Sequence, residues 1–216
     1  MNHFSRDIDI YDNLYLKKYK RYFDLILTIV LLVITTPILI IAAILIKISS
    51  KGPVFYKQKR VGIQEKLFVC YKFRTMYDSK TENELRGSGK SKTNKMGILN
   101  KRKDDERVTK IGSILRKTSI DELPQLFNVL IGDMSLVGPR PLMPFMLEPF
   151  PEIMQTRCKV LPGITGLWQV RGRKKNTTVL DMINYDLEYI LKANLIFDLY
   201  LIFSTIFAVI DTEGAY

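Results

Sequence analysis

The chain has 216 residues, 47% of them hydrophobic, and its 33 lysines and arginines against 22 aspartates and glutamates give a formal net charge of +11. This length suits one domain with room for a membrane segment, and the charge favours phosphorylated substrates, anionic lipid or nucleic acid. The single histidine, His3, lies near the N-terminus, which argues against histidine acid–base chemistry and Ser–His or Cys–His nucleophiles. Cys70 and Cys158 form no metal-ligand pattern and are predicted to be reduced thiols. Any catalysis must therefore fall to carboxylates.

Residues 22–46 form an almost entirely apolar segment that follows a basic, polar N-terminal stretch, residues 1–21. A straight helix of this length would be roughly 37 Å long, which is enough to cross a bilayer. Lysines and arginines flank both ends, however, so the positive-inside rule gives both ends the cytoplasmic side. Thr36 and Pro37 stand near the middle, where proline predicts a bend and threonine hydroxyls can satisfy the freed carbonyls. A re-entrant helix-break-helix fits both features, with a spanning helix as the alternative.

Residues 47–216 are predicted to form a small, α-rich α/β globular domain at the membrane surface. Short strands are expected at 53–61 and 67–75, around a turn. Five prolines keep 139–151 irregular. Helical periodicity marks three further stretches, which are 108–115, 123–131 and the amphipathic 178–191.

Two segments of this domain have two interpretations each. The highly charged stretch 79–107 is predicted to be a mobile loop, either a plain surface insertion or a lid over an anionic substrate. The apolar stretch 195–210 is short for a span, and fits either an interfacial helix or a helix packed on the domain.

Asp121 and Glu122 stand side by side in the segment 116–127, RKTSIDELPQLF. With Ser119 as N-cap, Glu122 completes a capping box, so the pair also fits a simple helix start. A helix N-terminus attracts phosphate and keeps a carboxylate ionised, which makes the two interpretations compatible. Neighbouring helical side chains diverge by about 100°. This favours separate roles, with one carboxylate attacking phosphorus and the other holding Mg²⁺.

Cationic residues are distributed around this acid pair. Gly138-Pro-Arg-Pro141 fixes Arg140 between two prolines, so its guanidinium loses little entropy when it binds a phosphate. Lys72 and Arg74 share a strand face, and Arg116 precedes Asp121 by five residues. Each of these cations taken alone also fits a solvated surface charge.

Two further residues are weaker candidates. Trp168, in the glycine-punctuated stretch 162–173, fits either the level of the lipid headgroups or plain packing. Asp186 has the default interpretation of an acid on a helix surface.

Several of these strings carry a resemblance to a known family. In chain order they are Thr36-Pro37, Gly52-Pro-Val-Phe55, Tyr71-Lys-Phe-Arg-Thr-Met76, Leu115-Arg116 through Asp121-Glu-Leu-Pro-Gln125, Asn128-Val-Leu, Gly132 to Pro141, Pro162 to Arg173, and Tyr185-Asp186. Together they resemble the monotopic phosphoglycosyl transferases, the bacterial sugar transferases that start the assembly of lipid-linked glycans. The match covers about residues 18–212, is most specific over 115–141, and is weakest over 79–107. Without extra N-terminal membrane helices, the chain resembles the small, minimal form.

The resemblance implies a reaction. Such enzymes transfer a phosphosugar from a UDP-sugar to a polyprenyl phosphate such as undecaprenyl phosphate, with Mg²⁺ and release of UMP. They act at the cytoplasmic face of the bacterial inner membrane, in the first membrane step of capsule, exopolysaccharide, O-antigen or glycoprotein glycan synthesis. Their membrane segment is re-entrant.

The resemblance also implies residue roles. Asp121 would be the nucleophile that forms a covalent phosphosugar intermediate, and Glu122, beside Asp121, would bind Mg²⁺. Arg140 would contact the nucleotide or its phosphates. The implied substrate-binding set is completed by Lys72, Arg74, Arg116, Gly138, Pro139, Pro141 and Asp186.

Two other functions are compatible with the composition. One is a basic, membrane-anchored module that binds anionic lipid or nucleic acid without catalysis. The acid pair disfavours it, because carboxylates repel phosphate unless a metal intervenes, so no nucleic-acid partner is expected. The other is a glycosyltransferase that moves sugar alone and would release UDP rather than UMP. The sequence does not identify the sugar, and a homodimer through 177–210 stays open.

Overall fold

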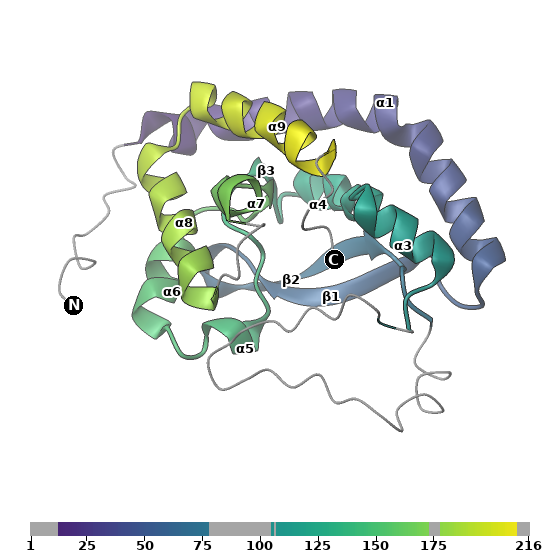
Figure 1. The fold of residues 1–216 in the computed structure, drawn as a ribbon. Helices are drawn as coiled ribbons and strands as arrows, with labels where there is room; N and C mark the ends of the chain where they lie inside the picture. Colours follow the sequence, from purple (N-terminus) through teal and green to yellow (C-terminus); the bar gives the residue numbers. More distant parts are fainter. Residues whose placement is uncertain (1–12, 78–104, 106, 173–177, 211–216) are drawn as a thin grey trace.

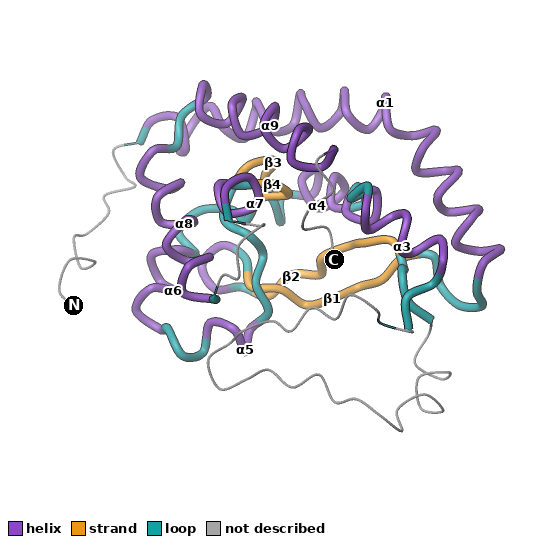
Figure 2. The backbone as a smooth tube through the Cα atoms, in the orientation of Figure 1, coloured by secondary structure: helices purple, strands orange, loops and turns teal. Residues whose placement is uncertain are grey.

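Helices surround two small sheets in the computed structural model, which describes residues 13–77, 105, 107–172 and 178–210 (Figure 1). Strands β1 (Phe55–Val61) and β2 (Leu67–Phe73) form an antiparallel sheet, and β3 (Ser135–Val137) pairs in parallel with β4 (Gly163–Thr165). Helices make up most of the rest of the described chain (Figure 2). The predicted α-rich α/β class is confirmed, whereas the charged loop expected at 79–107 lies almost wholly outside the described residues.

The N-terminal apolar segment is one long helix. A π-helical turn, η2 (Tyr15–Tyr19), leads into α1 (Lys20–Ser49), which contains Pro37 and bends along its length in Figure 1. Within the described chain, this is the one helix long and apolar enough to cross a membrane by length and composition. The helix is longer than the expected 22–46 and its helical backbone continues through Pro37. A re-entrant path therefore stays a prediction.

The threonines before Pro37 act differently from expectation. Their hydroxyls donate to the carbonyls of Leu31 and Leu32, at 2.7 Å from Thr35 and 2.6 Å from Thr36. Each acceptor lies four residues before its threonine. Neither is the carbonyl of Val33, which Pro37 leaves without its usual backbone donor. Such hydroxyl back-bonds bend helices, so they add to the effect of the proline.

Both ends of α1 are fixed to the same domain. Near its start, the Arg21 guanidinium donates to two carbonyls at the C-terminal end of α4 (Gln125–Ile131), at 2.6 and 2.9 Å. At its end, Arg74 donates to the carbonyls of Ser50 and Lys51, at 2.8 and 3.1 Å. The arginines thus satisfy carbonyls that helix ends leave unpaired.

The β1–β2 hairpin confirms the two predicted strands, each shorter than expected. Phe55 lies opposite Phe73 and Val61 opposite Leu67, across a 3-10 turn, η3 (Ile63–Glu65). Because side chains alternate along a strand, Lys72 shares one face with Arg60 on the neighbouring strand. This face is turned toward the acid pair described below.

The region between β3 and β4 is more ordered than its prolines suggested. It contains two short helices, α5 (Pro144–Leu147) and α6 (Pro151–Arg157). Each has its proline in the first turn, where the missing N–H has no partner to lose. Another short helix, α7 (Leu167–Arg171), follows β4. Glycine is required where the chain passes β3, because a Cβ on Gly163 would lie 2.1 Å from the Gly138 nitrogen.

The C-terminal part consists of α8 (Val179–Lys192) and α9 (Leu195–Ile210), close to the predicted limits. Thr178 and Asp181 form a reciprocal capping box at the start of α8, which the sequence interpretation had not identified. Ile183 on α8 and Leu201 on α9 are completely buried in the main core. Residues from α4, β3, α5, α7 and the β1–β2 hairpin also belong to that core.

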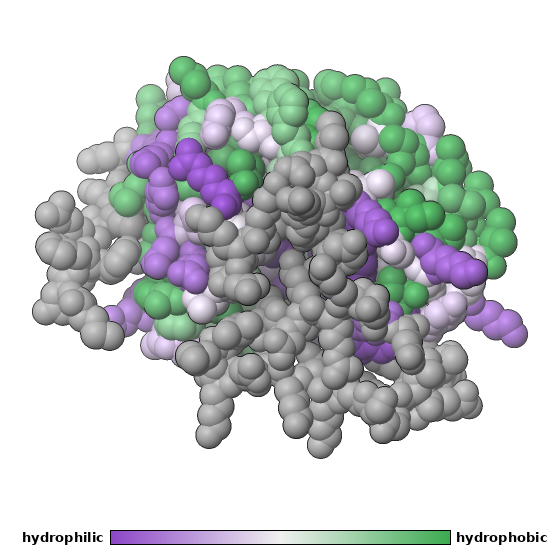
Figure 3. All heavy atoms as spheres, viewed as in Figure 1, coloured by the Kyte–Doolittle hydropathy of each residue, from purple (hydrophilic) through white to green (hydrophobic). Residues whose placement is uncertain are grey.

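The outer faces of α1 and α9 expose many apolar side chains. Ile34 is 63% exposed, Phe203 61% and Phe207 71%. Figure 3 shows hydrophobic residues gathered over these two helices. Since α9 also buries Leu201, the interpretation of this stretch as a helix packed on the domain is confirmed. Its position at a membrane interface stays a prediction.

One buried carboxylate joins both apolar helices to the centre of the fold. Asp198 of α9 is 0% exposed and accepts hydrogen bonds from three groups. The Lys20 ammonium and the Tyr15 hydroxyl are each 2.5 Å from its Oδ2, and the Tyr189 hydroxyl is 2.8 Å from its Oδ1. Tyr189 also donates to the carbonyl of Val137 in β3, so the network reaches the central sheet.

We expect Asp198→Asn to destabilise the protein by about 1–3 kcal/mol, because the amide weakens the buried hydrogen bonds from Lys20, Tyr15 and Tyr189, while Asp24, 3.8 Å from the Lys20 ammonium, remains as its charge partner. Thermal unfolding in detergent micelles measures the loss. Glu188→Gln is the matched control, since Glu188 pairs with the exposed Lys192 and should cost less than about 1 kcal/mol. Equal losses in Asp198→Asn and Glu188→Gln would contradict this role.

Candidate active site

Asp121 and Glu122 lie in a 3-10 turn, η5 (Ile120–Glu122), between α3 (Lys110–Lys117) and α4. Ser119 precedes the turn with a φ of 55°, in the left-handed region that is costly for serine. Its side chain makes no capping hydrogen bond, and the α-helix begins only at Gln125. The predicted capping box is therefore wrong. The tight turn leaves both carboxylates half-buried.

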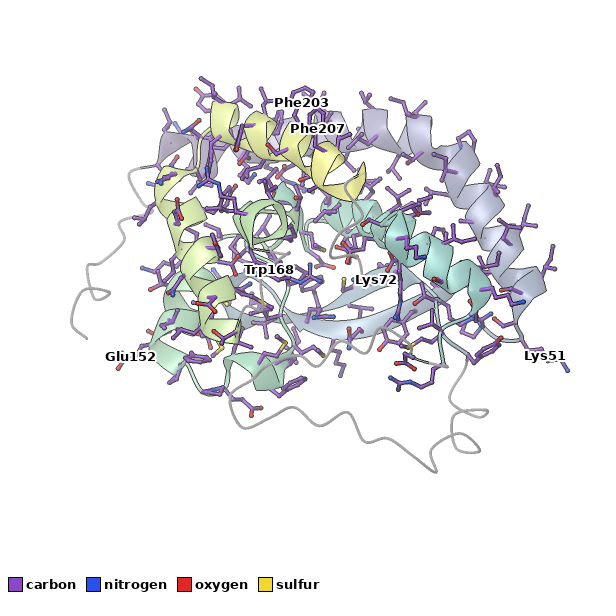
Figure 4. All side chains as sticks on the ribbon, in the orientation of Figure 1. Lys51, Lys72, Glu152, Trp168, Phe203 and Phe207 are labelled. Atoms are coloured by element: carbon purple, nitrogen blue, oxygen red, sulfur yellow. The ribbon has the colours of Figure 1, made fainter. Side chains whose placement is uncertain are left out.

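Glu122 lies between two cations. Lys72 Nζ is 2.5 Å and Arg140 Nη2 4.0 Å from its Oε1. The three side chains are 21–29% exposed, so a substrate can reach them. Lys72 comes from β2 and lies in the middle of the molecule (Figure 4). The structure thus brings together three of the predicted site residues from separate parts of the chain.

The electrostatic surroundings of Asp121 favour its protonated form. Burial, and then the neighbouring Glu122 carboxylate, raise the pKa of Asp121 to about 6, against the opposing effect of Lys72 and Arg116. The sequence interpretation expected a helix N-terminus to keep this carboxylate ionised, but α4 starts four residues later and burial dominates. Asp121 is still mainly ionised at neutral pH. Arg116 is oriented by a 2.9 Å hydrogen bond from its Nε to the Thr75 hydroxyl.

Only Arg140 of the Gly-Pro-Arg-Pro segment has a side chain partly open to solvent. Gly138, Pro139 and Pro141 are buried. The backbone here continues the central sheet, because the Gly138 amide donates to Thr165 and the Gly163 amide to Pro139, at 2.9 and 2.8 Å. Gly138, Pro139 and Pro141, which the sequence predicted as substrate-binding residues, therefore form the scaffold that presents Arg140.

Arg74 and Asp186 do not reach the acid pair. Arg74 is 6% exposed, and its guanidinium is turned away from Lys72 toward the C-terminal end of α1. Strand β2 ends at Phe73, so the expected common strand face is not continued. Asp186 is 1% exposed rather than on a helix surface. It accepts from the backbone amide of Arg140 at 3.2 Å, and so acts on the site through the backbone.

Trp168 is a packing residue, not a headgroup anchor. It is 4% exposed and lies within the main core. The Arg140 guanidinium carbon is 5.0 Å from the centre of its ring, in cation–π range. Figure 4 shows Trp168 in the interior, whereas Phe203 and Phe207 lie on α9.

Two arginines of the site were missed from the sequence. Arg60 of β1 donates to the Pro141 carbonyl at 2.9 Å, and its Nε is buried with no partner. Burial, and then the charge of Arg140, lower the pKa of the Arg60 guanidinium. Arg157 at the end of α6 is 2% exposed and pairs with Asp186 at 2.8 Å. No local motif marks either arginine in the sequence. Both matter through contacts with segments that are distant in the chain.

The acid pair offers a magnesium ion hard oxygen ligands. In the part of the chain that the structure describes, no three acidic, cysteine or histidine side chains cluster. Asp121 and Glu122 would therefore be the protein's contribution, which suits Mg²⁺ because it commonly takes one or two carboxylates together with substrate phosphates. Lys72 competes for Glu122 at 2.5 Å. The residues fit a metal that arrives with a phosphorylated substrate.

A family model for bacterial sugar transferases matches residues 15–212. The chain belongs to the bacterial sugar transferase family. This sugar transferase is 37% identical over 199 residues to the exopolysaccharide production protein ExoY of Sinorhizobium fredii, covering 91% of the chain and 88% of the relative. It is 39% identical over 205 residues to the UDP-glucose:undecaprenyl-phosphate glucose-1-phosphate transferase of Klebsiella pneumoniae, covering 92% of the chain and 41% of the relative.

A third relative has a different sugar in its name. The undecaprenyl-phosphate galactose phosphotransferase of Salmonella typhimurium is 41% identical over 201 residues, covering 91% of the chain and 41% of the relative. The sugar transferase thus spans less than half the length of the Klebsiella and Salmonella proteins, and most of ExoY. The predicted family resemblance is confirmed, and the relatives' names divide between glucose and galactose.

The raised pKa of Asp121 has a consequence for stability. Its folded value, about 6, lies above the ordinary 3.8, so the folded state binds the proton more tightly and the ionised carboxylate costs stability above pH 6. In metal-free buffer at pH 8, Asp121→Asn should therefore increase the free energy of unfolding by up to about 3 kcal/mol and raise the melting temperature accordingly. The gain should shrink as the pH falls through 6.

Asp181→Asn is the control for this pH dependence. The capping hydrogen bonds from Thr178 lower the pKa of Asp181, so its ionised form stabilises the fold. The same carboxyl-to-amide change should therefore lower the melting temperature at pH 8. A melting curve of Asp121→Asn that lies below the wild type at pH 8 would contradict the strained position of Asp121.

Proposed function

We propose that this sugar transferase moves a phosphosugar from a UDP-sugar to a polyprenyl phosphate and releases UMP. The observation that carries the proposal is the half-buried acid pair with four cations around it: Arg60, Lys72, Arg116 and Arg140. Two carboxylates alone would repel a diphosphate. Twice as many positive charges offset that repulsion in a partly desolvated site, where charge interactions are strong. The names of the relatives support the same substrates.

The proposed reaction has two displacements at one phosphorus. An Asp121 carboxylate oxygen attacks the sugar-bound phosphorus of the UDP-sugar, and the bond from that phosphorus to the bridging oxygen breaks, so UMP leaves with the oxygen. A phosphate oxygen of the polyprenyl phosphate then attacks the same phosphorus. Asp121 leaves as a carboxylate, and the product is a polyprenyl diphosphate sugar. No proton needs to be removed from either nucleophile when both are ionised.

The chain's own residues divide this work. Arg140 and Lys72 flank Glu122 and are placed to bind diphosphate oxygens. Arg116 favours the ionised form of Asp121. Magnesium, held by Glu122 and Asp121 with the substrate phosphates, would neutralise charge on the diphosphate. Cations that bind the phosphates also stabilise the UMP that departs.

The covalent step is testable without the lipid. Purified protein incubated with Mg²⁺ and UDP-glucose or UDP-galactose, without polyprenyl phosphate, should gain the mass of one phosphosugar and release an equal amount of UMP. Asp121→Asn should form no adduct, because an amide is not an adequate nucleophile, and should lose at least about 10³-fold in turnover. Intact-mass spectrometry and nucleotide chromatography give the two readouts.

Asp181→Asn, outside the site, is the matched control and should form the adduct like the wild type. An active wild type that consumes UDP-sugar and never shows an adduct would contradict the covalent route. Release of UDP would show transfer of sugar alone.

We further infer that α1 enters the membrane from the cytoplasmic side and returns to it. Both of its ends contact the same domain, through Arg21 at one end and Arg74 at the other. Two ends separated by a bilayer could not both bind one domain on one side. The basic residues at both ends and the apolar outer faces of α1 and α9 support the same orientation. The acid pair would then lie near the lipid phosphates of one leaflet.

Cysteine labelling tests this orientation. Lys18→Cys and Lys51→Cys introduce thiols at exposed positions on either side of α1 (Figure 4 labels Lys51). Both should react with a membrane-impermeant maleimide only after the cytoplasmic side is opened. The wild type is the control, because Cys70 and Cys158 are buried and should stay unlabelled. Labelling of the two positions from opposite sides would mean that α1 spans the membrane.

A further inference from the structure

The segment that carries Arg140 is short of backbone donors. Pro139 and Pro141 have no N–H, so the amide of Arg140 is the only main-chain donor across these three residues. The carbonyls on either side of Arg140 are held, that of Pro139 by the Gly163 amide at 2.8 Å and that of Pro141 by Arg60 at 2.9 Å. The amide and the carbonyl of Arg140 itself also need partners if its guanidinium is to have one direction.

Arg157 meets this need. Its Nε donates to Asp186 Oδ2 at 2.8 Å, and its Nη2 donates to the carbonyl oxygen of Arg140. The other carboxylate oxygen, Asp186 Oδ1, accepts from the Arg140 amide at 3.2 Å. Arg157 and Asp186 therefore form a closed clamp on both polar groups of one residue's backbone. The two side chains are only 2% and 1% exposed, so no solvent competes with these bonds.

The guanidinium of Arg140 takes no part in the clamp. With its backbone clamped, the guanidinium rests over the ring of Trp168 and reaches to 4.0 Å from Glu122. Trp168 belongs to α7, and the clamp comes from α6 and α8. Three helices thus converge on one arginine, although none of them carries the acid pair.

Stability alone does not explain a buried ion pair at this place. Replacing such a pair by well-packed apolar side chains is often neutral or favourable for folding. An apolar replacement could fill the space under the segment, but it could not bond the amide and the carbonyl of Arg140. The particular partners of Arg157 are what an orienting role requires.

The geometry points to Arg157 as a positioning residue that, with Asp186, aims Arg140 at the diphosphate of the UDP-sugar. This rests on the proposed function, since it takes Arg140 as the substrate-binding group. Arg157 itself touches no substrate. Its contribution is to fix the backbone from which Arg140 acts.

Kinetics of UMP release give the first test. Arg157→Lys keeps the charge next to Asp186 but loses the planar fork with which Arg157 bonds Asp186 through Nε and the Arg140 carbonyl through Nη2. Misplacing Arg140 should raise KM for the UDP-sugar and lower kcat/KM by about 10- to 100-fold. KM for the polyprenyl phosphate should change little.

A double-mutant cycle with Arg140→Lys separates positioning from general damage. If Arg157 acts through Arg140, the double variant should be scarcely worse than Arg140→Lys alone. Arg21→Lys is the matched control, because Arg21 also binds backbone carbonyls, in α4, without contacting the Arg140 segment. Its effect should multiply with that of Arg140→Lys. Equal multiplication for Arg157→Lys would overturn the proposal.

Fluorescence provides a readout that needs no turnover. The chain has one tryptophan, Trp168, so its emission reports on the nearby Arg140 charge. Arg157→Lys should shift the emission in the same direction as Arg140→Met, and should add nothing in the Arg140→Met background. An unchanged emission in Arg157→Lys, or a further shift in that background, would contradict the clamp.

Folding and function can be told apart in this design. Should Arg157→Lys not fold, Arg157→Gln with Asp186→Asn removes both buried charges at once and enters the same cycle and the same fluorescence comparison. A folded wild type that releases no UMP from UDP-sugars would defeat the proposed function, while the fluorescence result would still decide whether Arg157 orients Arg140.

Discussion

The buried carboxylate of Asp198 is the contact on which the rest of the structure depends. A charge in an otherwise apolar helix is costly unless it is paired, and here Lys20 of α1 supplies the opposite charge at 2.5 Å. Since Tyr189 bonds both Asp198 and the carbonyl of Val137, the network ties the two apolar helices to β3. The chain leaves β3 directly into the segment that presents Arg140. One ion pair therefore relates the apolar surface of α1 and α9 to the site.

The site itself shows an opposition between stability and chemistry. The nucleophile proposed here, Asp121, has to be ionised, and its burial beside Glu122 opposes that ionisation. The pKa of about 6 for Asp121 expresses this conflict. Lys72 and Arg116 limit the cost without forming a close pair that would block Asp121, whereas Lys72 does pair closely with Glu122. The left-handed Ser119 adds backbone strain at the same turn. A fold selected for stability alone would relieve these features.

Local patterns predicted the elements whose physics is local. The apolar run 22–46, the alternating strands and the amphipathic 178–191 were all found, within a few residues of the observed limits. Asp121, Glu122, Lys72 and Arg140 were chosen because of their charge and spacing, and the structure places them together. The short strands β3 and β4 were missed, because a three-residue parallel pair has no periodicity to detect. Arg74 was misplaced for a related reason: its partners are the carbonyls at the end of α1, which no strand pattern reveals. Arg60 and Arg157 were missed because their importance lies in backbone atoms of distant segments.

The double attachment of α1 limits how the two substrates can meet. Arg21 and Arg74 fix the helix to the domain at both ends, and Asp198 fixes α9 alongside it. On the proposed orientation, the acid pair therefore stays at one height relative to the leaflet. The soluble UDP-sugar can approach from the cytoplasm at any angle, whereas the lipid phosphate can move only within the headgroup layer. A site held rigidly at that layer needs no large motion of the domain to collect the lipid. This explains why buried polar bonds, such as those of Asp198 with Lys20 and Tyr189, relate the apolar helices to the central sheet.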